Sequence, residues 1–82
     1  MYIDIRDKKD FIMGHIDGAI NIYYIDLILN PERFLKKDSL YYIYCNNGLK
    51  SKTVVLKLKK MGYNCVNYDG GYNKYLLKKH KI

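Results

Sequence analysis

The segment Leu40–Ser51 reads LYYIYCNNGLKS, and it decides how the chain folds. Its first part, Leu40–Cys45, is a continuous apolar and aromatic run, which predicts a central β-strand buried on both faces. The next three residues, Asn46–Gly48, predict a tight loop, and Ser51–Met61 predicts an amphipathic helix. The apolar face of that helix consists of Val54, Val55, Leu58 and Met61. A thiol therefore ends a buried strand, a glycine-containing loop follows it, and a helix begins.

Strands and helices are expected to alternate on both sides of this segment. Further strands are predicted at residues 2–6, 20–22 and 64–68, and further helical segments at residues 7–13, 24–29, 30–35 and 72–79. Asp7 and Asn30 are expected to be helix N-caps, and Gly62 is expected to follow a helix end. This alternation predicts an α/β fold, with a small, mostly parallel sheet flanked by helices. Ligands of such sheets bind beyond the carboxyl ends of the strands, where Cys45 is expected to lie.

The length and composition suit one small globular unit. A chain of 82 residues is expected to form a single domain over residues 1–82. The two cysteines, Cys45 and Cys65, have neither a Cys-x-x-Cys spacing nor a zinc-ligand spacing, so we expect no metal and no cofactor. No run reaches the ~18 apolar residues of a membrane span, and the charged residues of Met1–Asp7 exclude a secretory signal. We therefore expect a cytoplasmic protein in which Cys45 stays a free thiol.

The net charge of +7 raises the question of an anionic partner. Lysines occur in scattered pairs such as Lys8-Lys9 and Lys59-Lys60, without a long basic run. Such scattering is typical of a solvated surface, so neither nucleic acid nor a membrane is expected as a partner. A weak attraction for small anions is compatible with this charge.

The loop after Cys45 has the features of a thiolate site. Gly48 permits a positive φ, so the loop can curl until successive backbone N–H groups converge on an anion. The helix N-terminus and Lys50 add positive charge, and such surroundings lower a cysteine pKa from ~8.5 to ~3.5–7.5. The alternative is that Cys45 is only a small buried apolar residue. The loop by itself does not decide between these interpretations.

Short motifs along the chain resemble those of the rhodanese homology domain. They are Asp4-Ile5-Arg6, the segment GHIDGAIN at residues 14–21, the loop Tyr44–Ser51, and Asp69-Gly70-Gly71 with Tyr75. The resemblance implies a rhodanese-like fold and a sulfurtransferase of the thiosulfate type. In that mechanism the Cys45 thiolate takes a sulfane sulfur from a small anionic donor such as thiosulfate. The resulting persulfide passes the sulfur to a thiol, cyanide or protein acceptor.

The resemblance also implies roles for the site residues. Cys45 is the expected catalytic residue, and substrate binding is expected from Asn46, Asn47, Gly48, Leu49, Lys50 and Ser51. Supporting roles are expected for Asp4, Arg6 and His15, with Arg6 a candidate anion contact and His15 a structural residue that holds its loop. Ser51 is expected to cap the following helix, or else to donate a hydrogen bond to the sulfur. Cys65 is expected in the core.

The loop length favours sulfur over phosphate as the transferred group. In the families that this chain resembles, sulfurtransferases have a six-residue loop and phosphatases a loop one residue longer. Cys45–Lys50 is six residues long. A Cys-x5-Arg phosphatase also needs arginine at position 51, because its planar fork binds phosphate at two points, and Ser51 stands there.

The sequence departs from the family pattern in several places. Lys50 stands where many relatives carry arginine, so the donor preference is left open, and Tyr75 stands where tryptophan is more frequent. The strand and helix that usually precede the first motif are expected to be lacking. An exposed sheet edge would then favour a partner or a homodimer. The alternative function is a noncatalytic rhodanese-like interaction module. Nucleic-acid binding rests on charge alone.

Overall fold

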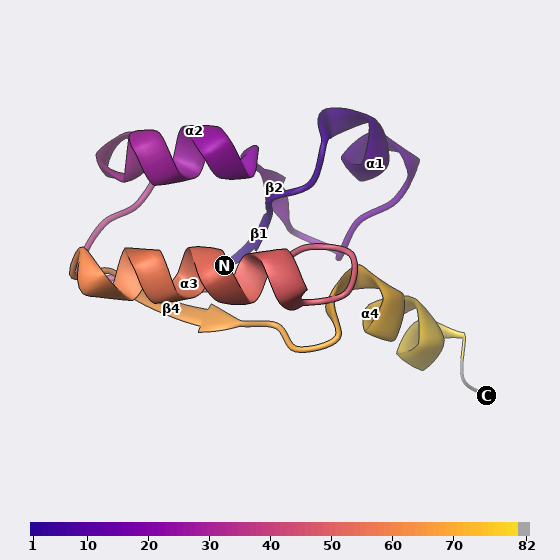
Figure 1. Ribbon diagram of the computed structural model, residues 1–82. Coiled ribbons are helices and arrows are strands. Elements are labelled where there is room, and N and C mark those ends of the chain that lie inside the picture. Colours follow the sequence, from indigo (N-terminus) through magenta and orange to yellow (C-terminus); the bar gives the residue numbers. More distant parts are fainter. Residues whose placement is uncertain (81–82) are drawn as a thin grey trace.

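The chain folds around one parallel β-sheet, and the computed structural model describes residues 1–80 (Figure 1). The four strands are β1 (Tyr2–Asp4), β2 (Ile20–Asn21), β3 (Leu40–Tyr44) and β4 (Asn64–Asn67). They pair in the order β2-β1-β3-β4, and every pairing is parallel. The predicted α/β class with a parallel sheet is confirmed, and β1 and β3 occupy its centre.

Helices connect the strands, as the alternating pattern predicted. They are α1 (Lys8–Met13), α2 (Tyr24–Leu29), α3 (Leu49–Lys60) and α4 (Gly71–Lys79), with a 3₁₀ turn at Pro31–Arg33. Asp7 occupies the predicted N-cap position of α1, and Asn30 occupies that of the 3₁₀ turn, but neither side chain forms a capping hydrogen bond. The helix predicted after Asn30 is only this short 3₁₀ turn. Helix α3 begins at Leu49, two residues before the predicted start.

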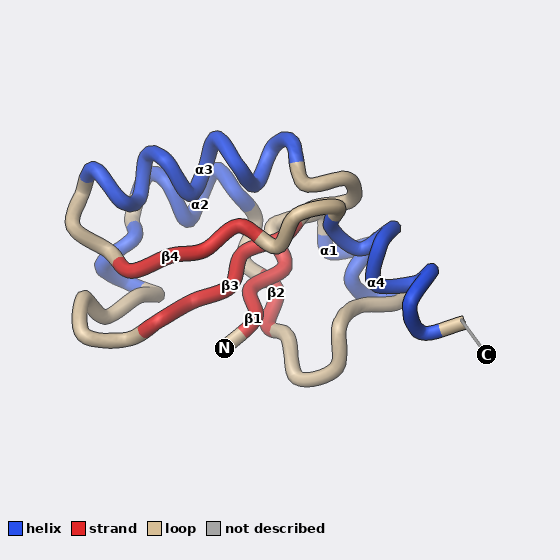
Figure 2. The backbone as a smooth tube through the Cα atoms, turned by 90° about the horizontal axis from the view of Figure 1, so that it is seen from below, coloured by secondary structure: helices blue, strands red, loops and turns tan. Residues whose placement is uncertain are grey.

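Helices α2 and α3 lie together on one face of the sheet (Figures 1 and 2). The main core fills this layer, where Ile3 and Ile43 of the sheet join Leu27 and Leu58 of the helices in one buried cluster. Val54, Val55 and Leu58 are buried, as the apolar face of α3 predicted. Met61 is not, with 40% of its surface exposed, because it is the capping residue at the end of α3.

Aromatic side chains cover part of the other face. Buried Tyr44 packs there with Ile16 and Ala19, and the partly buried Phe11 of α1 and Tyr72 of α4 join this cluster. Helices α1 and α4 gather toward the end of the sheet at which the strands finish (Figure 1). The prediction that β3 is buried on both faces is therefore right for Ile43 and Tyr44 and wrong for Leu40, which is 48% exposed at the start of the strand.

The register of the sheet brings two candidate motifs together. Asp4 of β1 pairs with Tyr44 of β3, and the Ile5 amide donates to the Tyr44 carbonyl at 3.1 Å. Arg6 therefore follows one central strand just as Cys45 follows the other. Within residues 1–80, no helix is long and apolar enough to cross a membrane.

Candidate active site around Cys45

Cys45 follows the last residue of β3, and its sulfur is surrounded by hydrogen-bond donors. The amide of Gly48 lies 3.2 Å from Sγ, and the amide of Ser51 lies 3.4 Å from it. The Ser51 hydroxyl oxygen is also 3.4 Å from Sγ. Cys45 itself is only 5% exposed. The sulfur is thus held in a nest of N–H groups, as the loop sequence predicted.

The loop reaches this shape through a left-handed residue and an early helix start. Gly48 has φ +89°, a conformation that glycine adopts without penalty. The backbone of Gly70 packs so closely that a Cβ at Gly48 would lie 2.8 Å from the Gly70 nitrogen. Because α3 begins at Leu49, the Ser51 amide lies in the first helical turn, where N–H groups have no partner within the helix. That amide is therefore free to donate to Cys45.

These contacts lower the pKa of Cys45 below that of an ordinary thiol. Burial alone raises the pKa, because it penalises the thiolate. Hydrogen bonds outweigh burial, first from the Ser51 hydroxyl and then from the amides of Ser51, Gly48 and Asn47. The physical causes are hydrogen bonds, and the charge of Lys50 is not among them. The expectation that Lys50 helps to ionise Cys45 is not supported.

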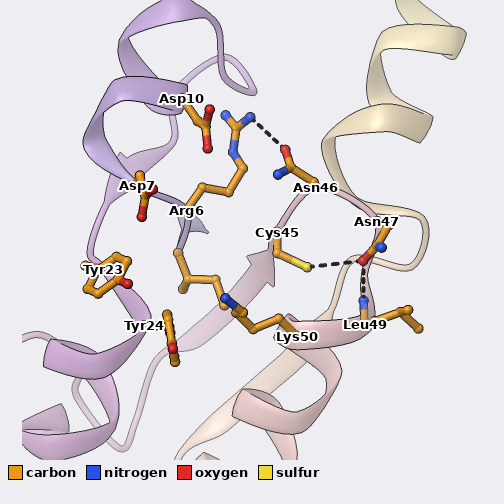
Figure 3. A pocket seen from close by; sticks show the side chains of 11 residues that line it. Arg6, Asp7, Asp10, Tyr23, Tyr24, Cys45, Asn46, Asn47, Leu49 and Lys50 are labelled. Carbon is orange, nitrogen blue, oxygen red and sulfur yellow. Dashed lines mark hydrogen bonds between the residues drawn. The ribbon is translucent and has the colours of Figure 1, made fainter.

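Lys50 contributes to the mouth of the site instead. A pocket of about 380 Å³ opens beside Cys45 (Figure 3). Its lining residues are Ile5, Arg6, Asp7, Asp10, Tyr23, Tyr24, Cys45, Asn46, Asn47, Leu49 and Lys50. The Lys50 ammonium lies 4.2 Å from the centre of the Tyr24 ring, a cation–π geometry that holds the charge over the pocket. Tyr24 therefore belongs to the site, and no motif in the sequence singled it out.

Asp4 and Arg6 form a buried ion pair that supports the loop. The Arg6 guanidinium donates to both carboxylate oxygens of Asp4, with a shortest distance of 2.7 Å. It also donates to the Gly14 carbonyl at 2.7 Å and to Asn46 Oδ1 at 3.2 Å. The guanidinium carbon lies 4.3 Å from the centre of the Tyr72 ring. Arg6 also borders the pocket, and its role as an anion contact stays a prediction.

His15 and Cys65 lie outside the pocket lining. His15 Nδ1 is 2.7 Å from the Phe11 carbonyl, and the two rings stack with centroids 3.7 Å apart. This arrangement holds the turn after α1, which is the structural role predicted for His15. Cys65 is 2% exposed in the core, and burial raises the pKa of its thiol.

The N-terminus of α4 anchors the Cys45 loop from behind. The Tyr72 amide donates to the Cys45 carbonyl at 2.8 Å, and the Asn73 amide donates to the Asn46 carbonyl at 3.0 Å. Gly71 has φ +60°, and a Cβ there would collide with both of these carbonyl oxygens. The Asp69-Gly70-Gly71 motif was the sequence signal for this close contact, although its partner was not predicted.

Ser51 has a partner that the sequence did not indicate. Its hydroxyl donates to Asn67 Oδ1, at the end of β4, over 2.5 Å. Ser51 is completely buried and lies within α3, where Gly48 is the capping residue. The expectation that Ser51 caps the helix is therefore wrong. No motif placed Asn67 near Cys45, because the pairing of β3 with β4 and the packing of α3 bring it there.

The side chains of Asn46 and Asn47 make different contacts in the loop. Asn47 Oδ1 accepts from the Leu49 amide at 3.0 Å and lies 3.9 Å from the Cys45 sulfur (Figure 3). Asn46 points its Oδ1 toward Arg6. Leu49 is 70% exposed on the rim.

Among residues 1–80, no group of three histidine, cysteine or acidic side chains is arranged to hold a metal ion.

Comparison with known proteins points to one family. Residues 1–78 match the family described as the Rhodanese-like domain. The putative sulfurtransferase YtwF of Bacillus subtilis is 34% identical over 84% of this chain and 66% of its own length. The thiosulfate sulfurtransferase GlpE of Shewanella oneidensis is 32% identical over 87% of this chain and 70% of its own length.

Solved structures show the same fold. A rhodanese-related protein from Thermoplasma volcanium superposes with a TM-score of 0.87 at 28% identity, over 98% of this chain and 79% of that one. The protein SSP1007 from Staphylococcus saprophyticus gives a TM-score of 0.82 at 32% identity, over 90% and 73% of the two chains. Among curated relatives, the chain spans 52% of an Arabidopsis thaliana protein named for high arsenic content, and about two thirds of YtwF.

Proposed function

Because this chain belongs to the rhodanese-like domain family, we propose that it is a sulfurtransferase that carries a sulfane sulfur as a persulfide on Cys45. The observation that supports the proposal most strongly is the pair of backbone amides, of Gly48 and Ser51, that donate hydrogen bonds to the sulfur. These groups favour an anion at this position. A cysteine with only a packing role would not need them.

The proposed reaction has two displacement steps. The Cys45 thiolate attacks the outer sulfur of a donor such as thiosulfate. The S–S bond of the donor breaks, and sulfite leaves with the bonding electron pair. A persulfide anion then stands on Cys45. A thiol, cyanide or protein acceptor attacks its outer sulfur, and the Cys45 thiolate is released for the next cycle.

The pocket supplies what such a cycle needs. The persulfide anion places its charge one atom beyond Sγ, and the curled backbone of Asn46–Gly48 offers preorganised dipoles to stabilise it. Lys50 is exposed at the rim and adds a cation for an incoming anionic donor. Asp7 and Asp10 line the same pocket, so the site is less basic than the net charge of the chain implies. This lining favours a physiological donor with less negative charge than thiosulfate.

Intact-mass spectrometry after incubation with thiosulfate tests this proposal. We expect the protein to gain the mass of one sulfur atom, and peptide mapping to place it on Cys45. Cys45→Ser should abolish both this gain and the release of thiocyanate with cyanide. Cys65→Ser is the matched control, because that thiol lies in the core with a raised pKa, and it should keep both activities.

A negative result has a defined meaning. If neither thiosulfate nor a low-molecular-weight persulfide adds sulfur to folded protein, the proposal fails. The chain would then act as a noncatalytic interaction module of the same family.

A further inference from the structure

The side chain of Asn67 is fixed in one orientation by two acceptors. Its Nδ2 lies 2.8 Å from a carboxylate oxygen of Asp69 and 3.2 Å from the Gly48 carbonyl oxygen. Both of these groups can only accept, so the amide nitrogen must face them. The amide oxygen, Oδ1, then faces the Ser51 hydroxyl. Asp69 therefore fixes the orientation of the Asn67 amide, so that its oxygen and not its nitrogen faces Ser51.

This orientation decides where the single hydroxyl proton of Ser51 lies. Asn67 Oδ1 has no proton to give, so the contact exists only if Ser51 donates. The lone pairs of Ser51 Oγ are then turned toward Cys45 Sγ, 3.4 Å away, and the thiol donates to them. The hydrogen bonds run in one direction, from Cys45 through Ser51 to Asn67.

We propose that Asn67 is a positioning residue that competes with the Cys45 sulfur for the Ser51 proton, so that ionisation of Cys45 costs the hydrogen bond between Ser51 and Asn67. A thiolate can only accept, and the lone pairs of Ser51 would repel it. The hydroxyl must rotate toward the sulfur, which leaves Asn67 Oδ1 without its donor. The N–H groups of the nest favour the thiolate, and Asn67 opposes them.

The competition has a consequence for the sulfur cycle, and this step rests on the function proposed above. In the persulfide, the inner sulfur is bonded on both sides and carries little charge. The Ser51 hydroxyl can then return to Asn67, and the backbone amides remain available to the outer, anionic sulfur. Asn67 therefore favours the loaded state over the free thiolate, and it keeps the free thiolate more nucleophilic than full hydrogen bonding would.

The other ionisable groups around Cys45 are unchanged when Asn67 is replaced. They are Arg6 and Asp7 between β1 and α1, Asp10 of α1, Tyr23 and Tyr24 at the start of α2, Lys50 of α3, and Asp69 between β4 and α4. None of them contacts Ser51 Oγ in the described structure. Replacing Asn67 therefore changes the direction in which the Ser51 hydroxyl donates its proton, without removing a charge.

The test is the pH dependence of Cys45 alkylation by iodoacetamide, which requires no sulfur transfer. Asn67→Leu removes the competing acceptor at similar volume. We expect it to lower the apparent pKa of Cys45 by about one unit, a tenfold change in the thiolate-to-thiol ratio. Ser51→Ala should raise the pKa by a similar amount. The double variant should match Ser51→Ala alone, because the effect of Asn67 passes through Ser51.

Controls separate this effect from loosening of the loop. Asn67→Leu also loses the bond to the Gly48 carbonyl, and a looser nest would raise the pKa, in the opposite direction. Asn64→Ala, on the same strand but bonded to the Lys37 carbonyl, should leave the pKa unchanged. Asn67→Asp keeps an acceptor and adds negative charge, so it should raise the pKa, and it serves if Asn67→Leu does not fold.

Three results would overturn the proposal. They are a raised or unchanged pKa in folded Asn67→Leu, a shift of equal size in the Ser51→Ala background, and a lowered or unchanged pKa in Asn67→Asp. Each can arise whether or not the protein transfers sulfur. Failure of the persulfide proposal, by contrast, appears as missing sulfur mass with the alkylation profiles intact.

Discussion

Replacing Gly71 with alanine should damage the active loop from a position outside the pocket lining. Gly71 has φ +60°, and an added Cβ would lie 2.6 Å from the Asn46 carbonyl oxygen and closer still to that of Cys45. Both obstacles are backbone atoms, so neither can move aside as a flexible side chain would. The collision must be relieved by separating the start of α4 from the Cys45 loop.

The loss of unfolding free energy in Gly71→Ala has two parts that can be measured separately. The left-handed conformation costs an alanine about 1–2 kcal/mol. Separating α4 from the loop also weakens the hydrogen bonds from the Tyr72 and Asn73 amides, worth about 1–3 kcal/mol together. The sum for Gly71→Ala is about 2–5 kcal/mol. Gly18→Ala is the matched control, because Gly18 has φ +82° with no atom within 4 Å of the added Cβ, and it should cost only the first part.

Urea denaturation provides the free energies of unfolding, and alkylation kinetics follow Cys45 in the same samples. We expect Gly71→Ala to lose more stability than Gly18→Ala and to raise the pKa of Cys45, since the displaced loop no longer aims its amides at the sulfur. Gly18→Ala should leave the pKa unchanged. Equal stability losses in the two variants, or an unchanged Cys45 pKa in Gly71→Ala, would refute the reasoning that α4 shapes the loop.

Further predictions concern charge. The alkylation rate of Cys45 should reach half its maximum at a pH below the ordinary thiol value of about 8.5. Because folding lowers the pKa of Cys45, its ionisation adds to the free energy of unfolding. This contribution is complete above the pKa of the unfolded chain and is lost as pH falls through the pKa of the folded protein. Urea denaturation at a series of pH values measures it. Arg6→Lys keeps the charge but loses the fork, so it should cost about 2–3 kcal/mol of unfolding free energy. Arg33→Lys, on the exposed surface, should stay within about 0.5 kcal/mol. Lys50→Ala should raise KM for thiosulfate about threefold to tenfold, whereas Lys52→Ala should not, in steady-state assays.

The elements that could be predicted from the sequence are those with a local cause. Every residue of the run before Cys45 is apolar or aromatic, so the run predicted a central strand without knowledge of its neighbours. Gly48 and the helix after it predicted a curled loop rich in N–H donors, because these features also depend on residues adjacent along the chain. The N-cap positions of Asp7 and Asn30 could likewise be predicted from residue type, although neither side chain forms a capping bond.

The candidate supporting residues show the limit of that reasoning. Asp4 and Arg6, which were expected to have supporting roles, form an ion pair, and Arg6 also donates a hydrogen bond to Asn46 of the loop. The motif could not show that Arg6 also donates a hydrogen bond to the Gly14 carbonyl. The exposure of Leu40 and Met61 was likewise missed, because each lies at an end of its own element, where the neighbouring layer no longer covers it.

The sequence by itself determined that a cysteine follows a buried strand and enters a glycine loop at the start of a helix. It did so because strand burial, loop shape and helix N–H groups depend on residues adjacent along the chain. The tertiary structure alone decided which groups control that cysteine. The partners Ser51 and Asn67 come from α3 and β4, and their contact depends on strand register and helix packing. A hydroxyl has one proton, and only the acceptor that the fold places beside it determines which way that proton points.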